Sequence, residues 1–226
     1  MGQRQFNGAL TFDGVDDAIT ATGPLLQSNG TVSAWVKPAT LDTSGNADGD
    51  GFIFAMSDYF NNNRMYLAQD DSAFEFAIGS SATFVDTGAD FDLNSWSFIT
   101  FSWDGGDYNV YFNGVLVKSG TYTGLTGGCN YITIGKWANC GNGGSKNYFN
   151  GQIDDVRIYD RALSAEEVSQ LFQKTGGDIK TSGLVGHWKL DDDSGTDVTD
   201  SSVSGFDGTM EGTLTGAGDS VTGIDG

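Results

Sequence analysis

The chain contains a long series of short apolar segments with alternating inward and outward positions, separated by turns rich in glycine and aspartate. Alternation over four to eight residues is the pattern of a half-buried β-strand. The clearest turn is Asn113-Gly114, between YNVYF and VLVK, because this dipeptide suits a two-residue hairpin. The 226 residues include 34 glycines and 2 prolines, which favours many tight turns and few helices. The pattern predicts one large all-β domain, and sandwiches of this size are common.

The predicted strands follow one another at the spacing of a sandwich. They cover residues 6–12, 18–20, 31–36, 51–57, 64–69, 73–78, 82–86, 95–103, 108–118, 130–136 and 150–159. One helix is expected from Ala165 to Phe172, because Ser164 and Glu167 have the spacing of a capping box. Beyond a short linker, residues 183–213 contain strand patterns but cannot bury them alone, and 214–226 form a small acidic tail.

The formal net charge is −19, and 26 of the 30 acidic residues are aspartate. Aspartate forms turns and binds hard cations, which fits a β protein rich in loops. No basic patch is visible, so neither nucleic acid nor an anionic membrane surface is an expected partner. There is no apolar run long enough for membrane insertion. No signal peptide is visible, which leaves a removed leader or exit by another route such as lysis.

Cys129 and Cys140 flank the predicted strand NYITIGKWA. A disulfide that fixes a loop is plausible in a secreted protein, and two reduced thiols are the alternative. The sequence leaves both states open.

The predicted strand through Ile153–Tyr159 raises the main chemical question. Val156 and Ile158 alternate as core-facing positions, which would put Asp154 on the same inward face. An ionised carboxylate on an inward face must be hydrogen-bonded, paired with a charge or bound to a cation. A metal ion is therefore one answer to weigh for this strand.

Several ordered motifs resemble a known family. They are TVSAWVKP, WSFITFSWDGGDYNVYFNGVLV, IGKWA and GQIDDVRIYDRALSAEEVSQLF, and the match covers residues 6–173. They resemble the laminin-G-like domains of the concanavalin A-like lectin/glucanase superfamily. The resemblance implies a jelly-roll sandwich of two antiparallel sheets.

The order of the segments is unusual for that family. Residues 183–213, GLVGHWKLDDDSGTDVTDSSVSGFDGTMEGT, resemble the opening stretch of such a domain, yet here they come last. Residues 220–226, SVTGIDG, resemble the segment that would run into FNGALTFDG at residues 6–14. The sequence therefore reads as a circularly permuted single domain. The last segment either completes its own sandwich, which a short linker favours, or that of a neighbouring copy, and a tandem array clipped in mid-repeat is the third possibility.

The resemblance also informs the chemistry. Family glucanases carry an E-x-D-x-x-E pattern, which this sequence lacks, so we expect no catalytic residues and no enzyme. The first strand ends in FDGVDD, and the family fold implies that it lies beside the strand with Asp154. We therefore predict a structural Ca²⁺ site formed by Asp13, Asp17 and Asp154, with capped turns as the alternative. The lone His187 is expected to be a packed structural residue.

Sugars bind through aromatic rings and polar loops, which makes several loop residues candidates for ligand binding. These are Tyr59, Phe60, Trp137, Asn142 and Tyr148. The leading hypothesis is a non-catalytic binding module, extracellular or surface-exposed, for a glycan or surface polysaccharide. The rival is a structural decoration or appendage subunit of a virion or filament that binds other copies of itself by strand exchange.

Overall fold

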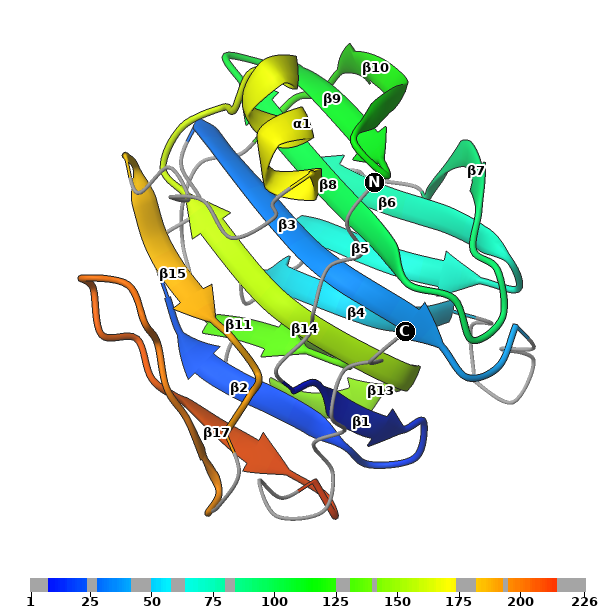
Figure 1. The fold of residues 1–226 in the computed structure, drawn as a ribbon, viewed down its shortest axis with the longest axis vertical. Helices are drawn as coiled ribbons and strands as arrows, with labels where there is room; N and C mark the ends of the chain where they lie inside the picture. The colour runs from blue at the N-terminus through cyan, green and yellow to red at the C-terminus, as the bar shows by residue number, and fades with distance from the viewer. Residues whose placement is uncertain are drawn as a thin grey trace.

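The computed structural model describes residues 8–23, 28–41, 50–57, 64–79, 84–124, 131–139, 142–173, 182–192 and 195–214. Within these residues, two antiparallel β-sheets face each other across one core (Figure 1). The predicted two-sheet antiparallel sandwich with a short helix is confirmed. In the part of the chain that is described, no helix has the length and apolar character needed to cross a membrane.

The seven-stranded sheet lies nearer the viewer in Figure 1. Its strands are β1 (Leu10–Asp13), β14 (Asn150–Tyr159), β3 (Asn29–Pro38), β8 (Ser97–Asp104), β9 (Asp107–Phe112) and β10 (Val115–Thr121), with β15 (Leu184–Trp188) also paired to β14. The turn between β9 and β10 is the predicted Asn113-Gly114 hairpin, and both residues have positive φ, 52° and 76°. The local sequence signal therefore determined this hairpin correctly.

The eight-stranded sheet lies behind the first. Its order is β16 (Asp197–Val198), β17 (Gly208–Glu211), β2 (Ala18–Thr22), β11 (Tyr131–Ile134), β4 (Asp50–Ser57), β5 (Arg64–Asp70), β6 (Ala73–Gly79) and β7 (Val85–Asp90). A separate two-stranded ribbon consists of β12 (Trp137–Asn139) and β13 (Asn142–Lys146). The strand predicted at 82–86 begins three residues later and ends at Asp90, with Gly88 at φ 79° in an irregular part of its pairing with β6.

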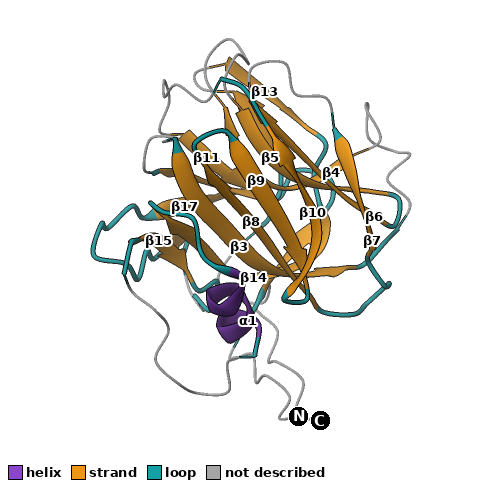
Figure 2. Ribbon diagram, turned by 90° about the horizontal axis from the view of Figure 1, so that it is seen from above, coloured by secondary structure: helices purple, strands orange, loops and turns teal. Residues whose placement is uncertain are grey.

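Helix α1 (Ala165–Phe172) covers the outer face of the seven-stranded sheet (Figure 2). It begins as predicted, because Ser164 Oγ accepts from the Glu167 backbone N–H at 3.3 Å and Glu167 Oε2 accepts from that of Ser164 at 2.9 Å. Phe172, at the end of the helix, stacks on Trp35 of β3 with ring centroids 5.7 Å apart. Aromatic packing thus fixes the helix on the sheet.

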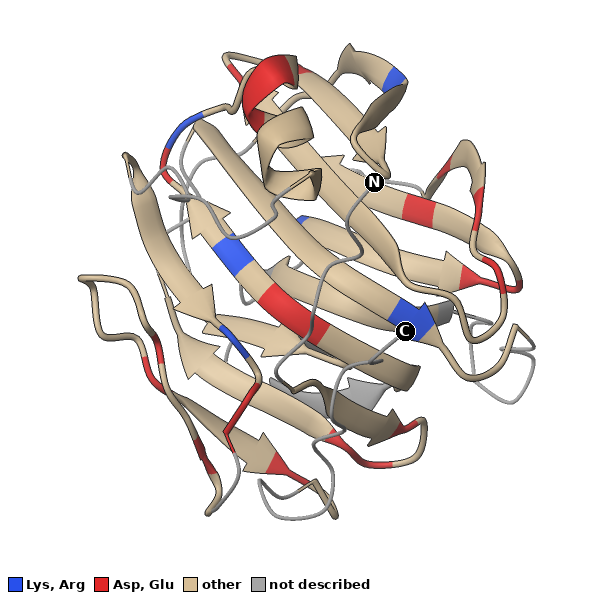
Figure 3. Ribbon diagram, in the orientation of Figure 1, with Lys and Arg blue, Asp and Glu red and all other residues tan. Residues whose placement is uncertain are grey.

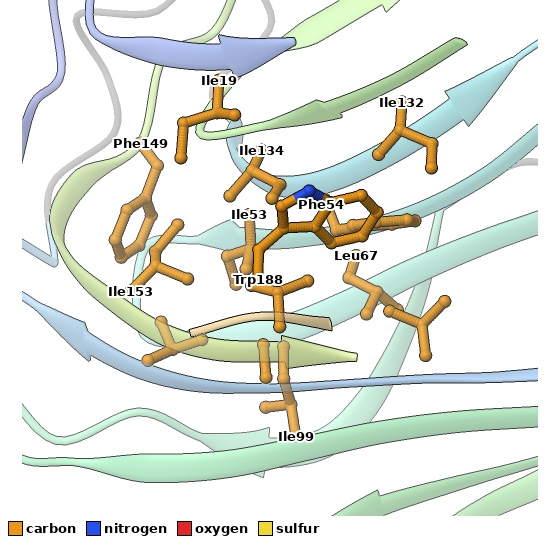
Figure 4. Close-up of a cluster of buried hydrophobic side chains, with 14 of the residues drawn as sticks. Ile19, Ile53, Phe54, Leu67, Ile99, Ile132, Ile134, Phe149, Ile153 and Trp188 are labelled. Atoms are coloured by element: carbon orange, nitrogen blue, oxygen red, sulfur yellow. The ribbon is translucent and has the colours of Figure 1, made fainter. Parts of the chain in front are cut away.

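The main core fills the space between the sheets. Figure 4 shows buried side chains from both sheets, with Trp188 of β15 in their midst. Trp188 is fully buried, and its indole N–H donates to the carbonyl of Phe206 at 3.0 Å. Residues 182–214 therefore contribute a central side chain of the core as well as edge strands.

One edge of β14 is shared by the two ends of the chain. β1 pairs with residues 150–153 of β14, and β15 pairs with residues 156–159. On the opposite sheet, β17 pairs with β2. In this structure the C-terminal segment thus adds strands to both sheets of its own chain.

The predicted inward position of Asp154 is wrong. A β-bulge lies between Asp154 and Arg157, where Asp155 and Val156 stand opposite one residue of β3. Asp155 adopts φ 53°, and the extra residue reverses the alternation, so Asp154 pairs with Trp35 on the outer face while Val156 stays in the core. Figure 3 shows an acidic segment and a basic segment close together along β14.

Candidate functional site

A cluster of aromatic side chains lies on the outer face of the eight-stranded sheet. Phe52 and Tyr66 contact each other edge to face, with ring centroids 5.3 Å apart. Phe84 lies 5.6 Å from the Phe52 ring and stacks on Tyr66 at 6.2 Å, and Trp137 packs against the same cluster. These four residues are called the aromatic patch below. Phe52 and Tyr66 are buried, whereas Phe84 is exposed and Trp137 is half-buried, so the last two rings give the aromatic patch its accessible surface.

Small residues on neighbouring strands make room for these rings. The register of β4, β5 and β6 aligns Ala55, Tyr66 and Ala77 in one row across the sheet. The next row contains Phe52 and Ala68, so each ring lies beside alanine side chains. The alternation along these strands sends the intervening residues, such as Leu67, into the main core.

A charged pair borders the aromatic patch on one side. Lys136 directly precedes Trp137, and its Nζ forms an ion pair with Glu211 Oε2 of β17. Burial raises the pKa of the Tyr131 phenol in β11, and the negative charge of Glu211 raises it further. This side of the face is therefore polar.

Two carboxylates face each other at β6 and β7, farther along the same sheet. Glu75 stands directly opposite Asp86, which places both side chains on one face. Burial raises the pKa of the Glu75 carboxyl, and the negative charges of Asp70 and Asp86 raise it further. Glu75 lies in the same row as Ala68 and Phe52, so the carboxyl is on the face that bears the aromatic patch.

The turn between β1 and β2 contains three aspartates, Asp13, Asp16 and Asp17, whose nearest oxygen atoms all lie within 4.8 Å of one another. Asp13 Oδ1 accepts backbone N–H groups from Val15 at 2.7 Å and Asp16 at 3.2 Å, while Asp17 Oδ2 accepts from the backbone of Asp13 at 3.0 Å. These bonds are the turn-capping arrangement. Oxygen donors of this type also suit a hard cation such as Ca²⁺, so the turn could hold one.

The C-terminal segment contacts this turn. Gly212 has φ 76°, and a Cβ atom there would lie only 2.3 Å from the carbonyl oxygen of Asp16. Burial raises the pKa of Asp17, and the charge of Asp13 adds to this, whereas hydrogen bonds from Thr213 and the Asp13 backbone oppose it. The positive φ and the close approach at Gly212 mean that the C-terminal segment can contact the turn in this way only because residue 212 is glycine.

Asp154 does not join the aspartates of the turn. The register of β1 and β14 places Asp13 opposite Asn150, four residues from Asp154 along the strand, or about 13 Å. The predicted set of Asp13, Asp17 and Asp154 is therefore not brought together, although the two strands are neighbours as expected. Among the described residues, the carboxylate cluster contains Asp16 instead.

Asp155 has a different set of partners. Its Oδ1 accepts from Arg157 Nε at 2.8 Å and lies 2.8 Å from His187 Nε2. His187 stands opposite Arg157 in the pairing of β15 with β14. All three residues are buried, so the lone histidine of the chain packs within a charged cluster that joins the C-terminal segment to β14.

The laminin G 3 family model, described as the concanavalin A-like lectin/glucanases superfamily, matches residues 13–169, more than half of the chain. The chain belongs to this superfamily. The family resemblance inferred from the sequence motifs is therefore confirmed. A search of curated protein sequences finds no match.

Several solved structures share the fold of this chain, one of them over nearly its whole length. A proposed carbohydrate binding protein from Bacteroides ovatus is 19% identical with a TM-score of 0.71, covering 99% of this chain and 61% of that one. The SAP-like pentraxin of Limulus polyphemus is 20% identical with a TM-score of 0.59, covering 76% and 84%. The chain thus spans about three fifths of the length of the Bacteroides protein.

A third similar structure has a higher sequence identity. It is domain 4 of AbnA, a GH43 extracellular arabinanase from Geobacillus stearothermophilus, in complex with arabinotriose. That domain is 30% identical to this chain with a TM-score of 0.51, and the match covers 65% of this chain and 67% of the domain.

The predicted ligand-binding residues lie in different parts of this superfamily member, and some lie outside the described residues. Trp137 is part of the aromatic patch, and Tyr148 pairs through its backbone with Phe52. Asn142 begins β13 and pairs with Asn139. Tyr59 and Phe60 lie outside the described residues, as do both cysteines, Cys129 and Cys140.

Sequence reasoning missed the other three residues of the patch, Phe52, Tyr66 and Phe84. Phe52 and Tyr66 lie in segments that read as ordinary strands, and both faces of these strands are apolar. The available signal was the pattern of alanines opposite aromatic residues, which becomes informative only once the strand register is known.

Proposed function

We propose that the chain is a non-catalytic carbohydrate-binding module that works outside the cell, with its ligand bound over the aromatic patch. The observation that carries this proposal is the position of the patch on the outer face of the eight-stranded sheet. The arabinanase domain supports it, because that domain is 30% identical and its structure contains arabinotriose. The same relative is part of an extracellular enzyme, which supports the location.

The patch has the chemistry that sugars require. Sugars present C–H groups on their flat faces and hydroxyl groups at their edges, so they bind aromatic rings flanked by polar side chains. Phe84 is 36% exposed and Trp137 is half-buried, so these two rings offer surface for stacking. The Glu75 carboxylate lies on the same face and is available to accept hydrogen bonds from hydroxyl groups.

Calorimetric titration with arabinotriose and a panel of other oligosaccharides tests the proposal. Trp137→Ala and Phe84→Ala should each weaken binding by about tenfold, which corresponds to ~1.4 kcal/mol. Leu116→Ala is the matched control, because Leu116 is an exposed apolar residue of β10 in the other sheet. Its affinity should equal that of the unmodified protein.

Three results would contradict parts of this proposal. If no oligosaccharide of the panel binds, or if the patch variants bind normally, the binding site is wrong. If sugar is hydrolysed and Glu75→Gln stops the hydrolysis, the module is catalytic, with the Glu75 and Asp86 carboxyls as its reacting pair. Recovery of the protein only from the cytoplasm of its source cells would contradict the extracellular location.

A self-assembling structural subunit, such as a virion or filament decoration protein, is the second candidate function. The observation that favours it is the way residues 182–214 supply strands to both sheets, because a neighbouring copy could receive the same strands. Sedimentation over a range of concentrations separates the two candidates. A monomer at all concentrations argues against the subunit, and ordered oligomers argue for it.

We also propose a structural Ca²⁺ ion at the turn of Asp13, Asp16 and Asp17. The donor set fits, because all three side chains offer oxygen ligands and the Asp16 carboxylate accepts no hydrogen bond from the described residues. A bound cation would offset the mutual repulsion of the carboxylates and the desolvation of Asp17. Its role would be to stiffen the turn that Thr213 contacts.

A further inference from the structure

We infer that Glu211 is a positioning residue for Trp137 and so couples ligand binding to the docking of residues 182–214. The inference rests on the proposed function, because it concerns the aromatic patch. The C-terminal segment would then support the binding face through Glu211, in addition to filling the core through Trp188. Three structural steps lead from Glu211 to the ring of Trp137.

The first step is the face on which Glu211 lies. Met210, its neighbour in β17, is buried in the main core opposite Ile19. Because alternate residues of a strand face opposite sides, Glu211 points to the outer face of the eight-stranded sheet. This is the face that bears the aromatic patch.

The second step is the burial of Lys136. Its side chain is only 3% exposed, whereas that of Glu211, its ion-pair partner, is 37% exposed. The buried Lys136 ammonium group needs the Glu211 carboxylate, because an unpaired buried charge is strongly unfavourable. Without the Glu211 carboxylate, the Lys136 side chain is expected to move until its ammonium group reaches water.

The third step links Lys136 to the ring. Trp137 is the next residue, and the turn before it is held by two hydrogen bonds: Thr133 Oγ1 donates to the Lys136 carbonyl at 2.8 Å, and the Gly135 N–H donates to the Ile53 carbonyl at 3.1 Å. The turn is short and tightly held, so a displaced Lys136 side chain strains it. The strain falls on Trp137, which is packed against the patch.

Two measurements test the inference on the full chain. The first is the indole N–H resonance of Trp137 by NMR without ligand, which should shift in Glu211→Gln and stay in place in Thr209→Ala. Thr209 is the matched control because it lies on the same face of β17 and is exposed. The second is the affinity for arabinotriose, which should fall about tenfold in Glu211→Gln and stay unchanged in Thr209→Ala.

A rescue variant separates positioning from direct contact with the ligand. Lys136→Met combined with Glu211→Leu replaces the ion pair with apolar side chains, which commonly preserves packing. If Glu211 acts through Lys136, the double variant should recover most of the lost affinity and the Trp137 resonance. A double variant that stays as weak as Glu211→Gln would overturn the positioning role.

The failure of the inference is distinguishable from that of the proposed function. If Trp137→Ala weakens binding while Glu211→Gln changes neither affinity nor the Trp137 resonance, the inference is wrong and the binding site stands. If Glu211→Gln shifts the resonance but no oligosaccharide binds, the coupling of the two residues stands and the carbohydrate site is wrong.

Discussion

Asp17 and Thr213 lie 196 positions apart in the chain and are joined by two hydrogen bonds. Asp17 Oδ1 accepts from the Thr213 backbone N–H at 2.9 Å and from its hydroxyl at 3.0 Å. Asp17 is only 3% exposed, and its other oxygen accepts from Asp13. One buried carboxylate thus joins the β1–β2 turn to the end of the described C-terminal segment.

Thr213→Ala should destabilise the protein by roughly 1.5–3 kcal/mol, because it removes a hydrogen bond to a buried charged group. Chemical denaturation with urea measures the change in the free energy of unfolding. Thr209→Ala is the control, since Thr209 is an exposed threonine of β17, the strand just before Thr213, and should change stability by no more than about 0.5 kcal/mol. Equal effects of the two substitutions would show that the contact with Asp17 contributes nothing.

The raised pKa of Asp17 predicts a pH dependence of stability. The folded protein holds the Asp17 proton more tightly than the unfolded chain does, so the free energy of unfolding falls as pH rises. The fall begins near the ordinary value of 3.8 and ends above the raised pKa of the folded state. Asp17→Asn should remove this part of the pH profile, as measured by urea denaturation at successive pH values without divalent ions. An unchanged profile would mean that Asp17 ionises normally in the folded protein.

Calcium should raise the melting temperature if the turn holds an ion. A ligand present at one hundred times its Kd stabilises the folded state by about 2.7 kcal/mol, and chelation with EDTA should reverse the gain. Asp16→Asn should abolish most of the shift, whereas Asp197→Asn should preserve it, because Asp197 is an exposed acidic residue of β16 outside the turn. The absence of any calcium effect on the unmodified protein would remove the metal proposal.

The features that the sequence predicted well are those determined by neighbouring residues. The helix bounds and the capping box of Ser164 and Glu167 follow from spacing within one turn of helix, and both are confirmed. The hairpin at Asn113-Gly114 depends on only two residues that tolerate positive φ. Neither feature needs knowledge of which strands become neighbours.

The position of Asp154 could not be predicted because one residue altered the alternation. Asp155 adopts a left-handed backbone conformation. Aspartate tolerates this conformation, but an aspartate in a sequence does not predict it. The bulge lies at the point on β14 where pairing with β1 ends and pairing with β15 begins. The bulge thus coincides with a change of strand partner, which involves three strands that are far apart in the chain.

The aromatic patch was only partly predictable for a related reason. Trp137 was identified as a candidate, whereas Phe52 and Tyr66 were interpreted as ordinary strand residues. Alternation separates the two faces of a strand, but it does not tell which face is the core when both are apolar. Only the pairing of β4 with β5 shows that Phe52 and Tyr66 lie on the outer face.

Trp188→Ala should destabilise the sandwich by about 3–5 kcal/mol, because it leaves a large cavity in the core between the sheets. Loss of this side chain should also loosen β15 from β14 and expose a strand edge, so aggregation is expected. Thermal unfolding and sedimentation measure the two effects. Leu116→Ala, which truncates a 51% exposed residue, should change neither. A monomeric Trp188→Ala variant with normal stability would mean that the C-terminal segment is not part of the cooperative core in solution.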